Sequence, residues 1–448
     1  MTVSLLLCTL FFVQIDDLEA WDQKIQEELT VNFITLDVMA VDKQGRPVTN
    51  LKASDFVVKD KGRKVKISFF DTLDMLAGEG EEPMPEDDSG NAHRDTAGKA
   101  DQQLILALDL EDVNTVQAAK TLKQLRSFIT TLDHVFNYRI LVYSMEHGAV
   151  TQGFVGQRKK VLLALDAFTA RHFGDRVDSR RPAAGEGTVL DDLAEDDSGP
   201  TTPWKQGSNL KRGPISLADL EEACEECMKL FQGNHPMRSS CINDNMNAFI
   251  EKHYDRTLRV LGELQSLTRK FEQQDGMKTM LLVSPGFSTT SLDAAIALPN
   301  FMLGGKDELH SQTAKLFNSE RMQHDYRTLL HSCTVNRIIF HAFDIYNPMD
   351  THQRAGSARF GKPIPKKVYN DYNQEVSSGL FFLAQDTGGS FTQAFTLSRP
   401  IGKVMNASRF YYHLGYNTPK GKKGAWRKLK ITCKRKGVRL TYRKGYFG

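Results

Sequence analysis

Acidic residues gather at the end of an apolar run in the stretch LILALDLEDVNT, residues 104–115. The five residues before Asp109 are uncharged and most are branched, which is typical of a buried strand. In open parallel sheets, ligands bind beyond the carboxyl ends of the strands. Mg²⁺ and Ca²⁺ are bound by oxygen ligands, carboxylates above all. Asp109, Glu111 and Asp112 are therefore candidate ligands of a divalent metal ion.

The same acids also have a purely structural interpretation. Asp109 is placed to cap the helix expected after it, because an N-cap carboxylate accepts hydrogen bonds from backbone N–H groups of the first turn. Glu111 and Asp112 would then lie at the positive end of the helix dipole. Asn114 is an equally good cap and a candidate for a binding surface at this edge. The sequence favours the structural role and leaves the metal site as the alternative.

Three of the six cysteines fall within one short segment, EEACEECMKLFQGNHPMRSSC. A local disulfide, either Cys227 or Cys224 with Cys241, is the favoured interpretation and implies an oxidising compartment. A zinc knuckle needs four ligands, and only His235 is nearby. A redox pair of Cys224 and Cys227 is the alternative, although the two glutamates between them would raise a thiol pKa, whereas reactive thiols need it lowered.

Sequence motifs of catalysis are missing from the chain. It has no G-x-S-x-G nucleophile elbow, P-loop, dinucleotide-binding glycine motif or H-E-x-x-H zinc motif. Ser284, in the stretch VSPGFS, lies at a strand end as a nucleophile would. However, Pro285 follows it and has no N–H to donate to an oxyanion. We therefore expect no enzyme, and Ser284 remains a candidate for a binding surface.

The length and charge of the chain indicate how many structural units it has and whether it binds nucleic acid. Its 448 residues exceed the size at which a single core stops growing, so two structural units are expected. The net charge of +3 is too small to imply a nucleic-acid partner. In the basic stretch near the C-terminus, period-two alternation places Leu429, Ile431 and Cys433 toward a core and the lysines toward water. This pattern indicates a solvated face, and no nucleic-acid partner is expected.

An apolar stretch near the N-terminus, VSLLLCTLFFV at residues 3–13, has the length of a signal-peptide core. It is shorter than the roughly 20 residues that span a bilayer, so no stable membrane span is expected. The stretch predicts an extracytoplasmic protein, secreted or periplasmic. Because no Lys or Arg precedes it, a cytoplasmic location is the alternative.

The periodicity of apolar residues changes twice along the chain. Period-two alternation near each end predicts antiparallel strands. Between them, apolar runs alternate with helical periodicity, the pattern of a mostly parallel sheet covered on both faces. The expected segments are a signal-like or tail segment at 1–22, strands at 28–72, a flexible linker at 73–101, an α/β domain at 102–403 with an insertion at 157–245, and strands at 404–448.

Five blocks of the sequence resemble, in order, those of the von Willebrand factor A-related domain proteins abundant in Acidobacteria. They are VDKQGRPVTNLKASDFVVKDKGRKVKISFF, LDLEDVNT, GMKTMLLVSPGF, LAQDTGGSF and FYYHLGYNTPKGKKGAWRKLKITCKRKGVRLTYRKGYFG. The resemblance implies a doubly wound, mostly parallel, von Willebrand factor A-like sheet. It also implies that this domain is inserted into a small antiparallel β-sandwich, made by the first and last β segments pairing with one another.

The resemblance further implies a metal-ion-dependent adhesion site at the carboxyl edge of the sheet. Asp109 falls on the first position of its D-x-S-x-S loop, but Glu111 and Val113 stand where the two serines belong, and a valine cannot ligate a metal. Ser284 stands in place of the carboxylate of the third loop. Thr257 is a poor match to the threonine of the second loop, because no Gly-Gly-Thr motif precedes its helix. We therefore expect a degenerate site and no cofactor, with a Mg²⁺ or Ca²⁺ ion as the alternative.

The function expected from these observations is that of a non-enzymatic, extracytoplasmic module that binds a protein partner in the manner of an adhesion domain. The insertion around Cys224–Cys241 is expected to shape the binding surface. The alternatives are a thiol-redox or metal-binding protein that uses Cys224 and Cys227, and a cell-envelope scaffold.

Overall fold

The computed structural model describes residues 33–74, 102–131, 138–177, 215–345, 364–418 and 425–447, with short gaps at 112, 147, 152, 273, 275, 305–308, 310, 312 and 394–395. Several expected features lie outside the described residues: the signal-like segment, most of the linker, residues 178–214 of the insertion, and Asp112. Among the described helices, none is long and apolar enough to cross a membrane.

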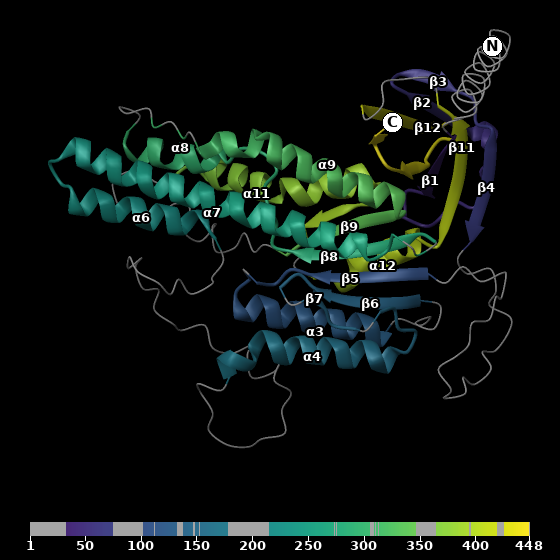
Figure 1. Cartoon of the computed structure of the whole chain (residues 1–448), viewed down its shortest axis with the longest axis horizontal. Coiled ribbons are helices and arrows are strands. Elements are labelled where there is room, and N and C mark those ends of the chain that lie inside the picture. The colour runs from purple at the N-terminus through teal and green to yellow at the C-terminus, as the bar shows by residue number, and fades with distance from the viewer. Residues whose placement is uncertain are drawn as a thin grey trace, which may run out of the picture.

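A six-stranded, mostly parallel sheet forms the centre of the molecule (Figure 1). Its strand order is β10-β9-β8-β5-β6-β7, and only β7 runs antiparallel to its neighbour. Numbered along the chain within this sheet, the order from β7 is 3-2-1-4-5-6, that of a doubly wound α/β sheet. The strands are β5 Gln102–Leu108, β6 Tyr138–Ser144, β7 Gly148–Ala149, β8 Lys278–Ser284, β9 Ile338–Asp344 and β10 Phe391–Gln393.

Helices cover both faces of this sheet because its strands bury side chains on both sides. In β5, Leu104 and Leu106 belong to one apolar core, and Ile105 and Ala107 belong to the other. The first core includes α3, α4 and α12, and the second includes α6, α7, α8, α9 and α11. Their bounds are α3 Thr115–Thr131, α4 Arg158–Val177, α6 Leu217–Leu230, α7 His235–Arg269, α8 Asp293–Met302, α9 Glu320–Val335, α11 Lys366–Thr387 and α12 Ser398–Ala407.

The helix α4 lies inside the range that the sequence assigned to the insertion. It packs on α3 and β6, and Phe168 and Phe173 are buried in the core beneath it. α4 is therefore a regular covering helix of the sheet. The described part of the predicted insertion therefore begins with a helix that belongs to the α/β layers.

Two four-stranded antiparallel sheets, in the orders β13-β1-β11-β4 and β14-β12-β2-β3, lie beside the amino ends of the parallel strands (Figure 1). β1 pairs with β11 and β2 pairs with β12, so the first and last β segments of the chain form these sheets together. Both sheets contribute to one apolar core. The strands are β1 Phe33–Val41, β2 Phe56–Asp60, β3 Arg63–Val65, β4 Phe69–Asp74, β11 Phe410–Asn417, β12 Trp426–Cys433, β13 Arg439–Thr441 and β14 Gly445–Phe447.

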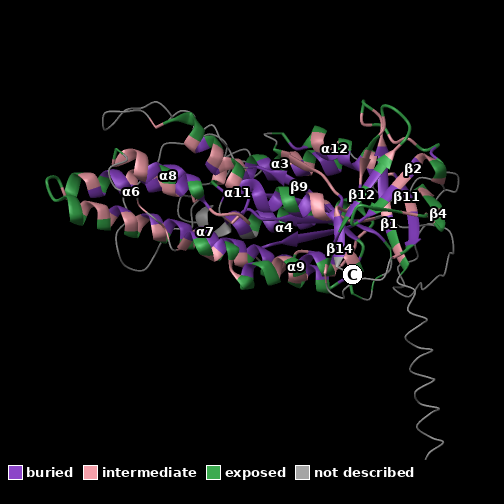
Figure 2. Cartoon of the chain, turned by 90° about the horizontal axis from the view of Figure 1, so that it is seen from above, coloured by how far each residue is buried: buried purple, intermediate pink, exposed green. Residues whose placement is uncertain are grey.

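The strand β12 alternates as its sequence predicts. Leu429 and Ile431 are buried, Cys433 packs against the same core, and Lys428 and Lys430 are exposed. Figure 2 shows the same distribution on the larger scale, with buried residues concentrated in the strands and exposed residues on the outer faces of the helices.

The helices α6 and α7 extend well beyond the carboxyl ends of the parallel strands, on the side away from the antiparallel sheets (Figure 1). α7 has 35 residues, so it is roughly 52 Å long. Only its C-terminal part packs along the sheet. Its N-terminal part forms a helical hairpin with α6 that projects from the edge where ligands of doubly wound sheets bind.

Candidate functional site

The end of β5 and the end of β8 meet at the carboxyl edge of the parallel sheet. This is the point where the strand order reverses, which is where doubly wound sheets bind their ligands. The backbone N–H of Asp109 donates to the carbonyl of Val283 (2.9 Å), and the hydroxyl of Ser284 donates to Asp109 Oδ2 (2.6 Å). The structure thus brings together Asp109 and Ser284, which are 175 residues apart in the sequence. Both are buried.

Arg256 of α7 completes this site and was not predicted from the sequence. Its Nη2 lies 2.8 Å from Asp109 Oδ2, and its Nε donates to the carbonyl of Gly286 at 3.0 Å. The Arg256 side chain is 4% exposed and that of Asp109 is 3% exposed. A guanidinium therefore occupies the position next to Asp109 at which a metal ion would be expected.

The loop after β8 is shaped to receive this guanidinium. Gly286 has a φ of 101°, a conformation that side chains rarely adopt. A Cβ at this position would also lie 2.9 Å from the carbonyl oxygen of Val376. Glycine is therefore needed at this position. It allows the sharp turn after Pro285 that brings the Gly286 carbonyl to Arg256.

The neighbours of Arg256 on α7, His253 and Thr257, add no positive charge to this site. Burial first, and then the charge of Arg256, lower the pKa of His253 to about 3, so this histidine is neutral near pH 7. The hydroxyl of Thr257 donates to the carbonyls of His253 (3.0 Å) and Ser288 (2.8 Å). Thr257 therefore serves the helix and the loop after β8 rather than a metal ion.

The remaining described positions of the expected adhesion site do not fit a divalent cation. Glu111 lies 3.4 Å from the Nε of Arg259, one turn further along α7 than Arg256. Val113 is buried in the apolar core. Among the residues that the structure describes, no group of three or more His, Cys, Asp or Glu side chains is arranged to hold a metal ion. A hard cation needs six or more oxygen ligands, and a guanidinium beside Asp109 would repel it.

The cap of the helix after β5 is Asn114. Its Oδ1 accepts a hydrogen bond from the backbone N–H of Gln117 at 2.7 Å, as an N-cap side chain does. The carboxylate of Asp109 instead binds Arg256 and Ser284. Of the two caps that the sequence left open, the structure has Asn114, and Asp109 belongs to the ion pair.

A second strand-end carboxylate, Asp344 of β9, lies at the same edge and carries no sequence motif. Its Oδ2 accepts hydrogen bonds from the Ser377 hydroxyl (2.6 Å) and from Gln393 Nε2 (3.0 Å). Asp344 is 2% exposed. Both strand-end carboxylates are thus satisfied by neighbouring side chains inside the protein.

The cysteines of the insertion join α6 to α7. Cys227 and Cys241 form a disulfide with their Cα atoms 5.8 Å apart, and Cys224 is a free, buried thiol. Burial, followed by the charges of Glu221 and Glu225, raises the pKa of Cys224 to about 12. A reactive thiol needs a lowered pKa, so Cys224 is an unreactive thiol that packs in the core.

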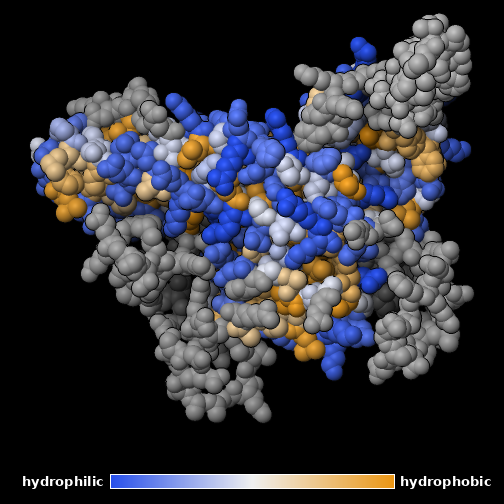
Figure 3. Space-filling view, viewed as in Figure 1, coloured by the Kyte–Doolittle hydropathy of each residue, from blue (hydrophilic) through white to orange (hydrophobic). Residues whose placement is uncertain are grey.

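The tip of the α6–α7 hairpin exposes apolar side chains next to this disulfide. Leu230 at the end of α6 is 67% exposed, and Met237 at the start of α7 is 52% exposed. Figure 3 shows apolar surface at this end of the molecule, over the turn between the two helices. The hairpin therefore presents an apolar tip held by a covalent bond.

Comparison of the sequence with protein-family models, curated proteins and solved structures finds no match.

Proposed function

We propose that this chain is a non-enzymatic, extracytoplasmic protein-binding module with a von Willebrand factor A-like domain, in which Arg256 has replaced the metal ion of a degenerate adhesion site. The observation that carries the proposal is the buried ion pair of Arg256 with Asp109 at the point where the strand order reverses.

Because of the ion pair, a carboxylate of a partner protein has no cation to bind at this edge of the sheet. In a metal-dependent adhesion site, the cation keeps one coordination position for a carboxylate of the partner protein. Here the guanidinium already donates to Asp109 and to the Gly286 carbonyl, and it is 4% exposed. A partner therefore has to be recognised elsewhere, by a surface that needs no divalent cation.

The hairpin tip is the surface that we propose for recognition. It projects beyond the closed edge, and its exposed Leu230 and Met237 are apolar side chains of the kind that form the centre of protein interfaces. The disulfide between Cys227 and Cys241 restrains the tip in the free protein, which lowers the entropy lost on binding. It also supports an oxidising location outside the cytoplasm.

The thiol-redox alternative gains no support from these cysteines. Cys227 is bonded to Cys241 rather than to Cys224, and the pKa of Cys224 is raised rather than lowered. The metal-binding alternative gains no support either, because among the described residues these cysteines belong to no group of three or more His, Cys, Asp or Glu side chains that could hold a metal ion.

Site-specific photo-cross-linking tests the proposal. A benzophenone amino acid is introduced in place of Leu230, and in a matched variant in place of Leu163, which is 57% exposed on α4 on the other face of the sheet. The proteins are irradiated in the native cells with and without a chelator. We expect one discrete cross-linked protein from position 230, absent from position 163 and unchanged by the chelator. Equal cross-linking from both positions, or its loss with the chelator, would refute the proposal.

A further inference from the structure

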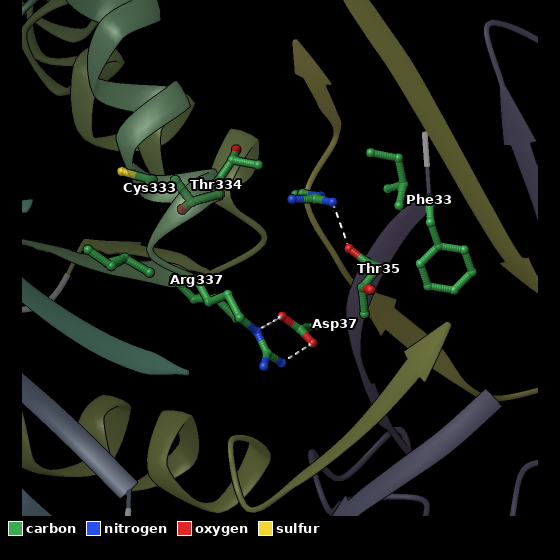
Figure 4. Close-up of a pocket in the computed structure, with 11 residues that line it drawn as sticks. Phe33, Thr35, Asp37, Cys333, Thr334 and Arg337 are labelled. Carbon is green, nitrogen blue, oxygen red and sulfur yellow. Dashed lines mark hydrogen bonds and ion pairs between the residues drawn. The ribbon is translucent and has the colours of Figure 1, made fainter. Parts of the chain in front are cut away.

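A cavity of about 220 Å³ lies at the end of the molecule opposite the ion pair, between the amino end of the parallel sheet and the antiparallel sheets. Its walls come from β1, from the end of α9 and the start of β9, and from the segment between β13 and β14 (Figure 4). Phe33 is 47% exposed and the Arg337 side chain is 41% exposed, so the cavity opens to solvent beside them.

One arginine of the cavity is already neutralised. Arg337 Nη2 lies 2.8 Å from Asp37 Oδ1, and Figure 4 shows the guanidinium facing this carboxylate. His413 Nδ1 lies 2.5 Å from the same oxygen. Burial alone would raise the pKa of Asp37, but the hydrogen bond with His413 and the charge of Arg337 outweigh it and hold the pKa below its ordinary value. Asp37 is therefore ionised and committed to these two partners.

The other arginine, Arg443, has no carboxylate partner within ion-pair distance in the part of the chain that the structure describes. Its Nη2 donates to the backbone carbonyl of Thr35 at 2.7 Å, while its buried Nε has no hydrogen-bond partner. Burial lowers its pKa, although arginine stays charged in proteins. With two arginines and one aspartate among its lining residues, the cavity wall carries an excess of one positive charge, which we assign to Arg443 because Arg337 holds the ion pair with Asp37.

The uncharged part of the lining is mostly apolar, with three threonines. Phe33, Ile34, Ile338 and Ile339 line the cavity, together with the buried Cys333. The hydroxyls of Thr334 and Thr387, which also line it, donate to backbone carbonyls of their own helices. Arg443 is therefore the lining residue whose positive charge has no carboxylate in ion-pair contact among the described residues.

We propose that this cavity binds a small monocarboxylate with an apolar body, its carboxylate on Arg443 and its carbon chain against Ile338 and Ile339. A guanidinium matches a carboxylate through paired N–H donors, and a single negative charge balances the single unpaired cation. The volume is below the roughly 300–1,000 Å³ of pockets for drug-sized ligands, which fits a short chain. A phosphate would bring a second negative charge that the cavity does not balance.

Calorimetric titration of the full chain with hexanoate, with 1-hexanol and with inorganic phosphate tests this proposal. We expect hexanoate to bind and the other two compounds to bind at least about tenfold more weakly, because a charged hydrogen-bonded pair is lost or mismatched. Arg443→Gln is expected to weaken hexanoate binding by a similar factor, and Arg439→Gln, an exposed residue of the neighbouring strand β13, to leave it unchanged.

Arg443→Gln also removes the bond to Thr35, so the site is located independently in the unaltered protein. Crystals soaked with 6-bromohexanoate are expected to show an anomalous bromine signal inside the cavity. The proposal is overturned if the bromine lies elsewhere, if hexanol or phosphate binds as tightly as hexanoate, if hexanoate does not bind, or if Arg443→Gln retains the full affinity.

Discussion

Substitution of Arg256 by methionine removes the cation of the buried pair and leaves Asp109 as an uncompensated charge. Only the Ser284 hydroxyl, at 2.6 Å, would remain of the two side-chain partners described above. Breaking a buried ion pair by removing one partner costs about 3–5 kcal/mol of unfolding free energy. Both side chains are less than 5% exposed, so solvent does not screen the loss. We expect Arg256→Met to lose an amount in this range.

The double variant Asp109→Asn with Arg256→Met separates the ion pair from ordinary packing. Without either charge, the desolvation penalty disappears, so the double variant is expected to be more stable than Arg256→Met alone. The matched control is Arg259→Met, whose guanidinium is 47% exposed and lies 3.4 Å from Glu111. Because the guanidinium of this pair is open to solvent, the pair is expected to contribute about 1 kcal/mol or less.

Urea unfolding followed by circular dichroism measures all of these variants under one condition. The reasoning is refuted if Arg256→Met loses no more than the Arg259→Met control. It is refuted equally if the losses of the two single variants, Asp109→Asn and Arg256→Met, simply add in the double variant, because additivity would mean that the two charges do not interact.

Three further predictions concern the disulfide, a buried carboxyl group and the loop after β8. Cys241→Ser is expected to lose about 3 kcal/mol of unfolding free energy, the value for a loop of about 15 residues, and a reducing agent is expected to produce a similar loss in the unaltered protein only. Burial, and then the charges of Asp293 and Asp371, raise the pKa of Glu375 to about 7 from 4.5, despite a hydrogen bond from the Ala294 N–H. Since the folded protein holds this proton more tightly than the unfolded chain, stability from this group is present below pH 4.5 and is lost as the pH rises through 7. Thermal melts at pH 4 and pH 8 are expected to differ less in Glu375→Gln than in the unaltered protein, and an equal difference would contradict this assignment. Gly286→Ala is expected to lower the melting temperature, because its φ of 101° is strained for alanine and its Cβ would crowd Val376; an unchanged melting temperature would contradict the described loop.

The parts of the fold that follow from periodicity could be predicted from the sequence. The apolar run before Asp109 is a buried strand of a mostly parallel sheet, and the alternation around Leu429 places that residue in a core. Both patterns work because burial repeats with the geometry of the strand itself. The helix α4 was missed because its apolar residues are interspersed with Arg and Lys, which weakens the helical pattern.

The candidate site was predicted only in part. Asp109 and Ser284 were expected at one edge because parallel strands end together, and the structure places them in contact. Arg256 gave no signal, since a charged residue in a long helix is usually solvated, and only tertiary packing brings it to Asp109. Asp344 was overlooked for a similar reason, because its partners lie on α11 and β10, distant in the sequence.

Calorimetric titration of Mg²⁺, Mn²⁺ and Ca²⁺ into the chelator-treated protein, with Asp109→Ala alongside, tests most directly whether Arg256 has replaced the metal ion. The account predicts no binding that depends on Asp109, and a variant that is only less stable than the unaltered protein. A cation that binds the unaltered protein and fails to bind Asp109→Ala would show that the strand end is a working metal site, and the proposed role of Arg256 would be wrong.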